Sequence, residues 1–289
     1  MRLSPECVPC ILKTVNLAVR LAGKDEEVQK EILSKAFPII ISNWDKTPVE
    51  VSLEIHRVIR RVTGVNDPFR EIKKMSNSLA SDLYPMLKKL VEVSIDKLES
   101  AIKLAIAGNA IDIVTVEASN FERTLMDTFS RKLMINDYLK FRDKVFSSHN
   151  LLYFLDNAGE VYTDKLLLDT IHDIRGKDFD SITIVVRGGP IVNDATMDDL
   201  KDAGLDKLPN VSIVYSSNGE EDTGIKPNSI ELDNLIKQYD FIISKGMGNY
   251  EVLEDGTNIF FLMIAKCLPI AEKLNVKLND PVLKYSTRD

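Results

Sequence analysis

The sequence predicts an α/β protein in which an N-terminal helical region precedes a doubly wound, mainly parallel, three-layer α/β/α domain. From Cys10 to about Phe129, apolar side chains recur every three or four positions, as on one face of a helix. From about Asn150, short runs of β-branched and aromatic residues alternate with helix-like segments. Strands at that spacing are typical of β-α-β units and a parallel sheet.

The helical region is expected to span residues 1–135 and to cover a cleft. Ile11, Val15 and Val19 show the helical spacing near its start. Breakers divide the region at Gly23, Pro38, Pro48, the segment 64–68, Pro85 and Gly108. Because glycine and proline interrupt helices, this division predicts roughly five or six helices.

The α/β domain is expected to span residues 136–289. Its predicted strands are Leu151 to Leu155, Ile182 to Val186, Val211 to Tyr215, Phe241 to Ser244 and Ile259 to Ile264. Its predicted crossover helices are Tyr162 to Arg175, Met197 to Ala203, Ile230 to Tyr239 and Pro269 to Leu274. No long linker precedes this domain, so we expect both regions to pack as one body with a cleft between them.

The composition narrows the function classes. With 289 residues, a formal net charge of −7 and a pI near 5.2, the chain lacks the basic face that a general nucleic-acid surface needs. It shows neither an apolar run that could span a membrane nor the pattern of a secretory signal. Its three cysteines fit a reducing compartment. We therefore expect a cytoplasmic protein without nucleic-acid or membrane partners, and its oligomeric state stays open.

Two predicted strands end in acidic and amide side chains. Asp156 and Asn157 follow the first strand, and Glu160 begins the next helix. Asp194 closes a similar unit, which also carries Arg187, a residue able to grip an oxyanion. Because parallel strands present their carboxyl ends at one edge, these side chains would lie together and suit a hard cation such as magnesium or manganese. The alternative is that the acids only cap the following helices.

A further strand end carries Lys245, Gly246 and Asn249. A lysine beside exposed backbone amides is a candidate phosphate cradle, and the alternative is a solvated surface lysine. The segment is not a dinucleotide fingerprint, because Glu251 stands where the third glycine should be. Lys266, after the last predicted strand, is a second candidate for the cleft, with a surface position as its alternative.

The helical region contributes a short polar motif. Gly108, Asn109 and Asp112 interrupt a helical pattern. A helix C-terminus with a left-handed residue explains the glycine and the asparagine without any function. Only a position beside the cleft would give these residues a role in binding.

The three cysteines are a separate candidate site. Cys7 and Cys10 have the spacing of half a zinc site, but a structural zinc site needs four ligands. A three-thiolate site that includes Cys267, or a redox pair near it, is one reading. Inert cysteines at a helix start and a strand end are the other.

The order of these motifs resembles that of one known family. The motifs are Cys7-x-x-Cys10, Gly108-Asn109-x-x-Asp112, Asp156-Asn157-Ala158-Gly159-Glu160, Asn193-Asp194, Lys245-Gly246-x-x-Asn249-Tyr250 and Lys266-Cys267. Together they resemble the damage-control phosphatase family, long catalogued as domain of unknown function 89. The paired N-terminal cysteines look like its microbial branch, and the resemblance covers nearly the whole chain.

The resemblance implies a metal-dependent phosphatase that acts on small phosphorylated metabolites, including sugar phosphates and damaged phosphometabolites, with manganese, nickel, cobalt or magnesium as cofactor. It implies catalytic and metal-binding roles for Asp156, Asn157 and Asp194. The substrate- and phosphate-binding residues that it implies are Lys266, Lys245, Asn249, Asn109, Asp112 and Glu160. Phe69 departs from the family pattern, in which a tyrosine is expected.

The mechanism we expect is mainly one of positioning and electrostatics. A cation on Asp156, Asn157 and Asp194 binds a phosphate oxygen, and Lys266 with Lys245 neutralises the remaining charge. The nucleophile is either water or Asp156, because an aspartate serves as a ligand or as a covalent acceptor. We favour water, because Ala158 stands where one class of aspartyl phosphatases has its second aspartate.

Two other functions compete with hydrolysis. One is a metal- or redox-responsive metabolite-binding protein whose essential site is Cys7, Cys10 and Cys267. The other is a carboxyl methyltransferase, an activity attached to relatives of this family. We rank it last, because no adenosyl-binding glycine loop follows the first strand of the α/β domain.

Overall fold

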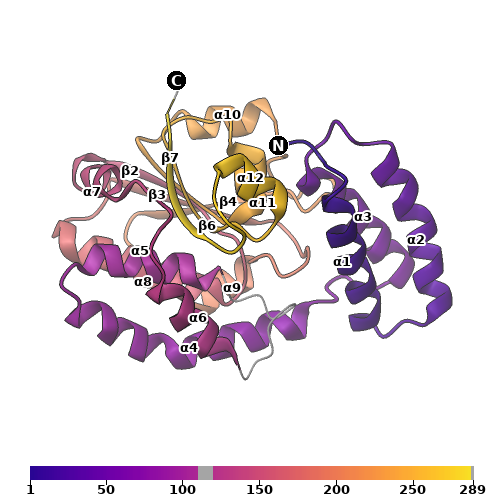
Figure 1. Ribbon diagram of the computed structural model, residues 1–289, viewed down its shortest axis with the longest axis horizontal. Helices are drawn as coiled ribbons and strands as arrows, with labels where there is room; N and C mark the ends of the chain where they lie inside the picture. Colours follow the sequence, from indigo (N-terminus) through magenta and orange to yellow (C-terminus); the bar gives the residue numbers. More distant parts are fainter. Residues whose placement is uncertain (110–119, 288–289) are drawn as a thin grey trace.

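The computed structural model describes residues 1–109 and 120–287, and it confirms the α/β class (Figure 1). Within these residues one seven-stranded sheet has the order β1-β7-β6-β5-β2-β3-β4. Its strands are β1 (Ile135–Asn136), β2 (Asn150–Phe154), β3 (Ser181–Arg187), β4 (Val211–Ser216), β5 (Phe241–Lys245), β6 (Ile259–Ile264) and β7 (Pro281–Ser286). Neighbouring strands run parallel except β7, which is antiparallel to β6. The sheet is therefore mainly parallel, as predicted.

Helices precede the sheet and alternate with its strands. They are α1 (Cys7–Leu21), α2 (Glu26–Ile41), α3 (Pro48–Thr63), α4 (Arg70–Val93), α5 (Lys97–Gly108), α6 (Phe121–Ser130), α7 (Tyr138–Ser147), α8 (Glu160–Arg175), α9 (Met197–Asp202), α10 (Ile230–Ile236), α11 (Gly246–Leu253) and α12 (Leu268–Leu274). The start of α3 follows from its sequence, because Thr47 and Glu50 form a capping box. Gly64 ends α3 at a φ of 70°, a conformation that favours glycine. No helix in the described ranges is long and apolar enough to cross a membrane.

Two of the predicted helix breaks were wrong. Pro38 lies inside α2, and Pro85 lies inside α4. A proline inside a helix costs about 3 kcal/mol relative to alanine. Both helices bury apolar side chains on each side of the proline, as Ala80 and Leu87 show for α4. Tertiary burial therefore outweighs the local preference of the proline.

The sheet is covered on both faces, which confirms the three-layer arrangement. Along β2, Leu151 and Tyr153 pack with α4, α5, α6 and α8 in one core. The alternate residues Leu152 and Phe154 pack with α10, α11 and α12 in a second core. Figure 1 shows these two groups of helices on opposite sides of the sheet.

Helices α1, α2 and α3 form a separate layer with a core of their own (Figure 1). Arg60 joins this layer to the α/β part, because its guanidinium donates to the carbonyl oxygens of Pro190 at 2.9 Å and Asn218 at 3.2 Å. By contrast, α4 to α6 share their core with the sheet. The expected boundary between residues 135 and 136 stays a prediction.

Two further elements follow from packing that periodicity did not indicate. The strand β7 begins at Pro281, and its Val282 and Leu283 are buried on opposite faces of the sheet. The helix α11 begins at Gly246 and buries Tyr250 and Leu253. This segment was expected as a strand end with a candidate phosphate cradle, and its glycines have a low helix propensity.

Candidate functional site

The loops after β2 and β3 are joined by backbone hydrogen bonds. The N–H group of Ala195 donates to the carbonyl oxygen of Asp156 at 2.8 Å. Asn157 and Asp194 form an isolated antiparallel bridge. The structure therefore brings Asp156, Asn157 and Asp194 to one place at the carboxyl edge of the sheet.

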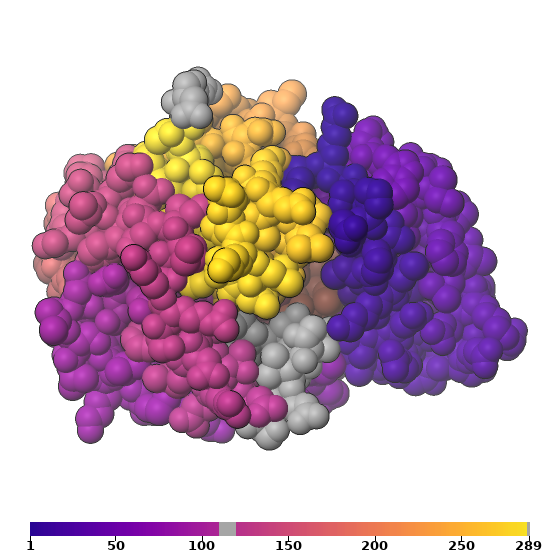
Figure 2. Space-filling view, in the orientation of Figure 1, coloured from indigo at the N-terminus to yellow at the C-terminus, as the bar shows by residue number. Residues whose placement is uncertain are grey.

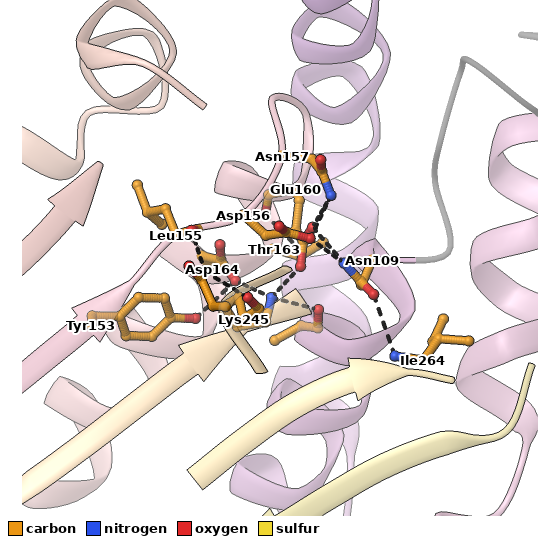
Figure 3. A network of polar contacts seen from close by, with 12 residues as sticks. Asn109, Tyr153, Leu155, Asp156, Asn157, Glu160, Thr163, Asp164, Lys245 and Ile264 are labelled. Carbon is orange, nitrogen blue, oxygen red and sulfur yellow. Dashed lines mark hydrogen bonds and ion pairs between the residues drawn. The ribbon is translucent and has the colours of Figure 1, made fainter. Parts of the chain in front are cut away.

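The carboxylate of Asp156 is held by two amides. Its Oδ2 atom accepts hydrogen bonds from Nδ2 of Asn157 at 2.6 Å and from Nδ2 of Asn109 at 2.7 Å (Figure 3). Gly246 lies directly against it, since a Cβ atom there would be 1.9 Å from Asp156 Oδ2. Gly246 also has a φ of 75°. Both the space and the backbone conformation therefore require glycine.

The carboxylate of Asp194 is held by an arginine at the end of β3. Arg187 donates from Nε to Asp194 Oδ2 at 2.9 Å, and its Nη2 atom forms an ion pair with the same oxygen at 2.9 Å. Its Nη1 atom donates to the carbonyl oxygen of Ser217 at 2.8 Å. This charge-assisted hydrogen bond and the ion pair hold the carboxylate of Asp194 against Arg187.

The electrostatics of the site favour a cation. Burial raises the pKa of Asp156 well above its ordinary value, and the charges of Glu160 and Asp194 raise it further, against Lys266 and Lys245. Burial also raises the pKa of Asp194, and Arg187 opposes the shift. Three carboxylates thus share one buried region, where a bound cation would stabilise their charged forms.

Lys245 lies beneath this site and is completely buried. Its Nζ atom donates to Glu160 Oε1 at 2.6 Å, to Asp164 Oδ1 at 2.5 Å and to the carbonyl oxygen of Ala105 at 2.9 Å (Figure 3). Burial opposes its charge, but Asp164 and Glu160 raise the pKa of Lys245 above its ordinary value overall. All three of its N–H groups are therefore used inside the protein, and the solvated-surface alternative is wrong.

Glu160 connects Lys245 to the two amides of the site. Its side chain is fully buried. Its Oε1 atom accepts from Lys245, and its Oε2 atom accepts from Asn109 and Asn157 at 3.1 Å each. Glu160 therefore faces the interior network rather than open space. Through it, the ammonium group orients the side chains that hold Asp156.

Asp164 and Tyr153 complete the network and were missed by sequence reasoning. The hydroxyl group of Tyr153 donates to Asp164 Oδ1 at 2.8 Å. The spacing of Glu160 and Asp164 was a usable signal, because residues four apart lie on one face of a helix. Two acids on the buried face of α8 require a cation partner, and Lys245 is that partner.

The other candidate residues have different surroundings. Asn249 donates from Nδ2 to the carbonyl oxygens of Leu155 at 2.9 Å and Lys245 at 2.8 Å, so it ties α11 to the end of β2. Lys266 is half-buried, and its charge acts on Asp156. Asp112 lies outside the described residues.

Two cavities adjoin the site. One of about 230 Å³ is lined by Asp156, Asp194, Asn249 and all three cysteines. A larger one of about 690 Å³ lies beside Arg187 and has a basic rim of Arg70, Lys73 and Lys74. The ammonium group of Lys73 is 2.7 Å from the carboxylate of Asp67. A small ligand therefore has space on either side of the Arg187–Asp194 pair.

The side chains at the site fit a hard divalent cation. Two carboxylates and one amide are oxygen ligands of the kind that magnesium and manganese prefer. Nδ2 of Asn157 donates to Asp156 and Glu160, which leaves its Oδ1 atom to act as a ligand. Across the described ranges, no three side chains of His, Cys, Asp or Glu are grouped so that they could hold a metal ion. A site with three protein ligands here therefore needs the amide oxygen of Asn157 in addition to Asp156 and Asp194.

The fold and the site together define an α/β protein with an oxygen-rich ligand site at the carboxyl edge of a mainly parallel sheet, where such folds bind ligands. The chain belongs to the damage-control phosphatase family: the model of the damage-control phosphatase ARMT1-like domain matches residues 3–282. The resemblance inferred from the motifs is therefore confirmed.

Individual relatives agree with this assignment. A damage-control phosphatase of Archaeoglobus fulgidus is 33% identical, with 98% of this chain and 99% of the relative covered. A damage-control phosphatase of Pyrococcus horikoshii is 31% identical, with 96% and 95% covered. The crystal structure of a DUF89 family protein from Pyrococcus horikoshii matches with a TM-score of 0.84 at 31% identity, covering 99% of both chains.

Proposed function

We propose that this chain is a metal-dependent phosphatase that hydrolyses small phosphate esters, such as sugar phosphates or damaged phosphometabolites. Its family and the names of its relatives support phosphatase activity and a small phosphorylated substrate. The observation that carries the proposal is the pairing of the β2 and β3 loops, which brings Asp156, Asn157 and Asp194 together beside a cavity.

In this proposal Asp156, Asn157 and Asp194 hold manganese, nickel, cobalt or magnesium through oxygen atoms. The bound ion supplies stabilisation of the charge on the phosphoryl oxygens. Arg187 supports the site by holding Asp194 through a hydrogen bond and an ion pair. Asn109 supports it by holding Asp156, while its own Oδ1 atom accepts from the N–H group of Ile264 at 3.3 Å.

The two lysines have different proposed roles. Lys266 neutralises charge on the phosphate, a role supported by the action of its charge on Asp156. Lys245 positions Asn109 and Asn157 through Glu160, since its ammonium group is buried with three partners. This role replaces direct contact between Lys245 and the phosphate in our mechanism.

We propose water as the nucleophile and Asp156 as a ligand. Two amides donate to the same oxygen of Asp156, which holds its carboxylate in one orientation. Ala158 is buried beside this site, where a second aspartate would be needed for one class of covalent mechanism. Acid quenching during turnover of a radiolabelled phosphate ester distinguishes the routes, because attack of Asp156 leaves a phosphoryl group bonded to the enzyme, whereas direct attack of water leaves none.

The proposal is tested by phosphate release from sugar phosphates, nucleotides and an aryl phosphate. Chelated protein is resupplied separately with magnesium, manganese, cobalt or nickel. Release should require a metal and should be lost in Asp156→Ala and Asp194→Ala. Asp82→Ala is the matched control, because Asp82 is an exposed acid on α4. Metal-independent release, or full activity in folded Asp156→Ala, contradicts the proposal.

A further inference from the structure

Three cysteines from distant parts of the sequence line one cavity. Cys7 and Cys10 lie in the first turns of α1, and Cys267 directly precedes α12. All three line the cavity of about 230 Å³ that also contains Asp156 and Asp194. None of the three is in a disulfide. The thiols therefore share one space with the candidate phosphatase centre, although none of them has a role in the proposed hydrolysis.

The thiols differ in accessibility. Cys10 is exposed, whereas Cys7 and Cys267 are half-buried. Burial raises the pKa of Cys267 to about 11, and the charges of Glu251 and of the other two thiols add to the shift. The thiols are thus near enough to influence one another. A small oxidant in solvent meets Cys10 first, because accessible thiols react first and Cys267 is held in its protonated form.

The position of these cysteines gives two kinds of disulfide different consequences. Cys7 and Cys10 are three residues apart on α1, so a bond between them stays within one helix. A bond to Cys267 instead joins the layer of α1, α2 and α3 to the α/β part. Figure 2 shows that these parts touch, since the indigo N-terminal segment lies against the yellow C-terminal segment.

We propose that Cys7, Cys10 and Cys267 form one oxidisable thiol site, in which reaction with a small disulfide creates a disulfide bond between Cys267 and a thiol of α1 across the cavity beside Asp156 and Asp194. The bond narrows this cavity, in which we place the phosphate ester. It thereby inactivates the enzyme until the disulfide is reduced. The loss of activity rests on the proposed phosphatase function, whereas the formation of the bond does not.

The reaction balances with a small disulfide such as oxidised glutathione. The thiolate of Cys10 attacks one sulfur of the small disulfide and expels one thiolate. The thiol of Cys267 then gives up its proton and attacks the sulfur of Cys10, which expels the second small thiolate. Two protein thiols are oxidised, one small disulfide is reduced, and the two protons end on the released thiols. If Cys7 intercepts Cys10 first, exchange of that bond with Cys267 gives the same cross-link.

Tryptic digestion identifies the bond, because the cysteines fall in two peptides. Cleavage after Arg2 and Lys13 releases residues 3–13, and cleavage after Lys266 and Lys273 releases residues 267–273. Protein treated with oxidised glutathione should yield these two peptides joined, with one alkylated thiol left in residues 3–13. Cys267→Ser should yield no joined peptide. A bond confined to residues 3–13, or glutathione left on Cys10, overturns the proposal.

Activity decides whether the bond closes the cavity. Oxidised wild-type protein should lose metal-activated hydrolysis of an aryl phosphate and regain it with a dithiol reductant. Reduced Cys267→Ser should match reduced wild type and should keep its activity after oxidation. Cross-linked protein with unchanged turnover overturns the closure. Absence of hydrolysis in reduced wild type defeats the proposed function instead, and the peptide map still decides whether the thiol site exists.

Discussion

Lys245 and Glu160 form an ion pair in which Nζ lies 2.6 Å from Oε1 and both side chains are completely inaccessible to solvent. The partners come from β5 and α8, which are far apart in the sequence. Glu160 also accepts hydrogen bonds from the amides of Asn109 and Asn157, and both amides donate to Asp156. The stability of the protein and the geometry of its site therefore depend on the same buried charge.

Replacement of Lys245 by methionine should destabilise the protein strongly. It leaves Glu160 and Asp164 buried without their cation, and breaking a buried pair typically costs about 3–5 kcal/mol. Urea unfolding followed by circular dichroism measures the change. The double variant Lys245→Met with Glu160→Gln should recover part of the loss, because one buried charge is removed with its partner. Equal stabilities for wild type and Lys245→Met would contradict the role of this pair.

Replacement of Arg187 by lysine should weaken metal binding more than folding. A lysine cannot reproduce the way the guanidinium contacts both Asp194 and the carbonyl oxygen of Ser217, and loss of such support typically costs about 10- to 100-fold in metal affinity. Calorimetric titration with manganese measures the affinity. Arg70→Lys is the control, because Arg70 lines the larger cavity without contacting Asp194 in the part of the chain that the structure describes. Equal affinities in the two variants would count against a supporting role for Arg187.

Replacement of Gly246 by alanine should displace Asp156. The added Cβ atom would lie 1.9 Å from Asp156 Oδ2. Gly176→Ala is the matched control, since Gly176 has a φ of 64° and no atom within 4 Å of an added Cβ. Both variants pay the left-handed backbone cost of about 1–2 kcal/mol. Unfolding and metal titration should show a further loss only in Gly246→Ala, and matching results in both variants would mean that the contact with Asp156 has no effect.

Glu251 should make the stability fall as the pH rises. Burial raises its pKa from 4.5 to about 8, and Glu254 adds to the shift against the N-terminal charge. The folded protein therefore binds more protons than the unfolded chain between these two values, so the free energy of unfolding decreases across that window. Below the lower value Glu251 is protonated in both states, so it does not make the free energy of unfolding depend on pH.

Glu251→Gln tests this prediction, because glutamine has no proton to lose. Its urea midpoint should decline less than that of wild type between pH values near 5 and 8. Glu92→Gln is the control, since Glu92 is exposed on α4. A decline in Glu251→Gln as steep as in wild type would assign the pH dependence to other groups.

The sequence predicted the strands better than the turns between helices. The runs that became β2, β3, β5 and β6 are rich in apolar residues because most of their side chains are buried on both faces of the sheet. The strand β7, which lies between β1 and β6, carries a weaker signal and begins with Pro281. Pro38 and Pro85 predicted helix ends where none exist, because their local cost is small beside the apolar surface that α2 and α4 bury.

The sequence also determined which polar residues would meet at the sheet edge. Asp156 and Asp194 follow strands that lie side by side, and parallel strands end at the same edge. Tertiary structure alone decided that Lys245 points into the interior, because its partners Glu160 and Asp164 lie on a helix more than 80 positions away. It also decided that Cys267 faces α1, because a cavity is enclosed only when distant segments pack. The local hydrophobic pattern of the sequence indicates the periodicity of each helix or strand. The direction of a single side chain depends instead on which distant segments pack against it.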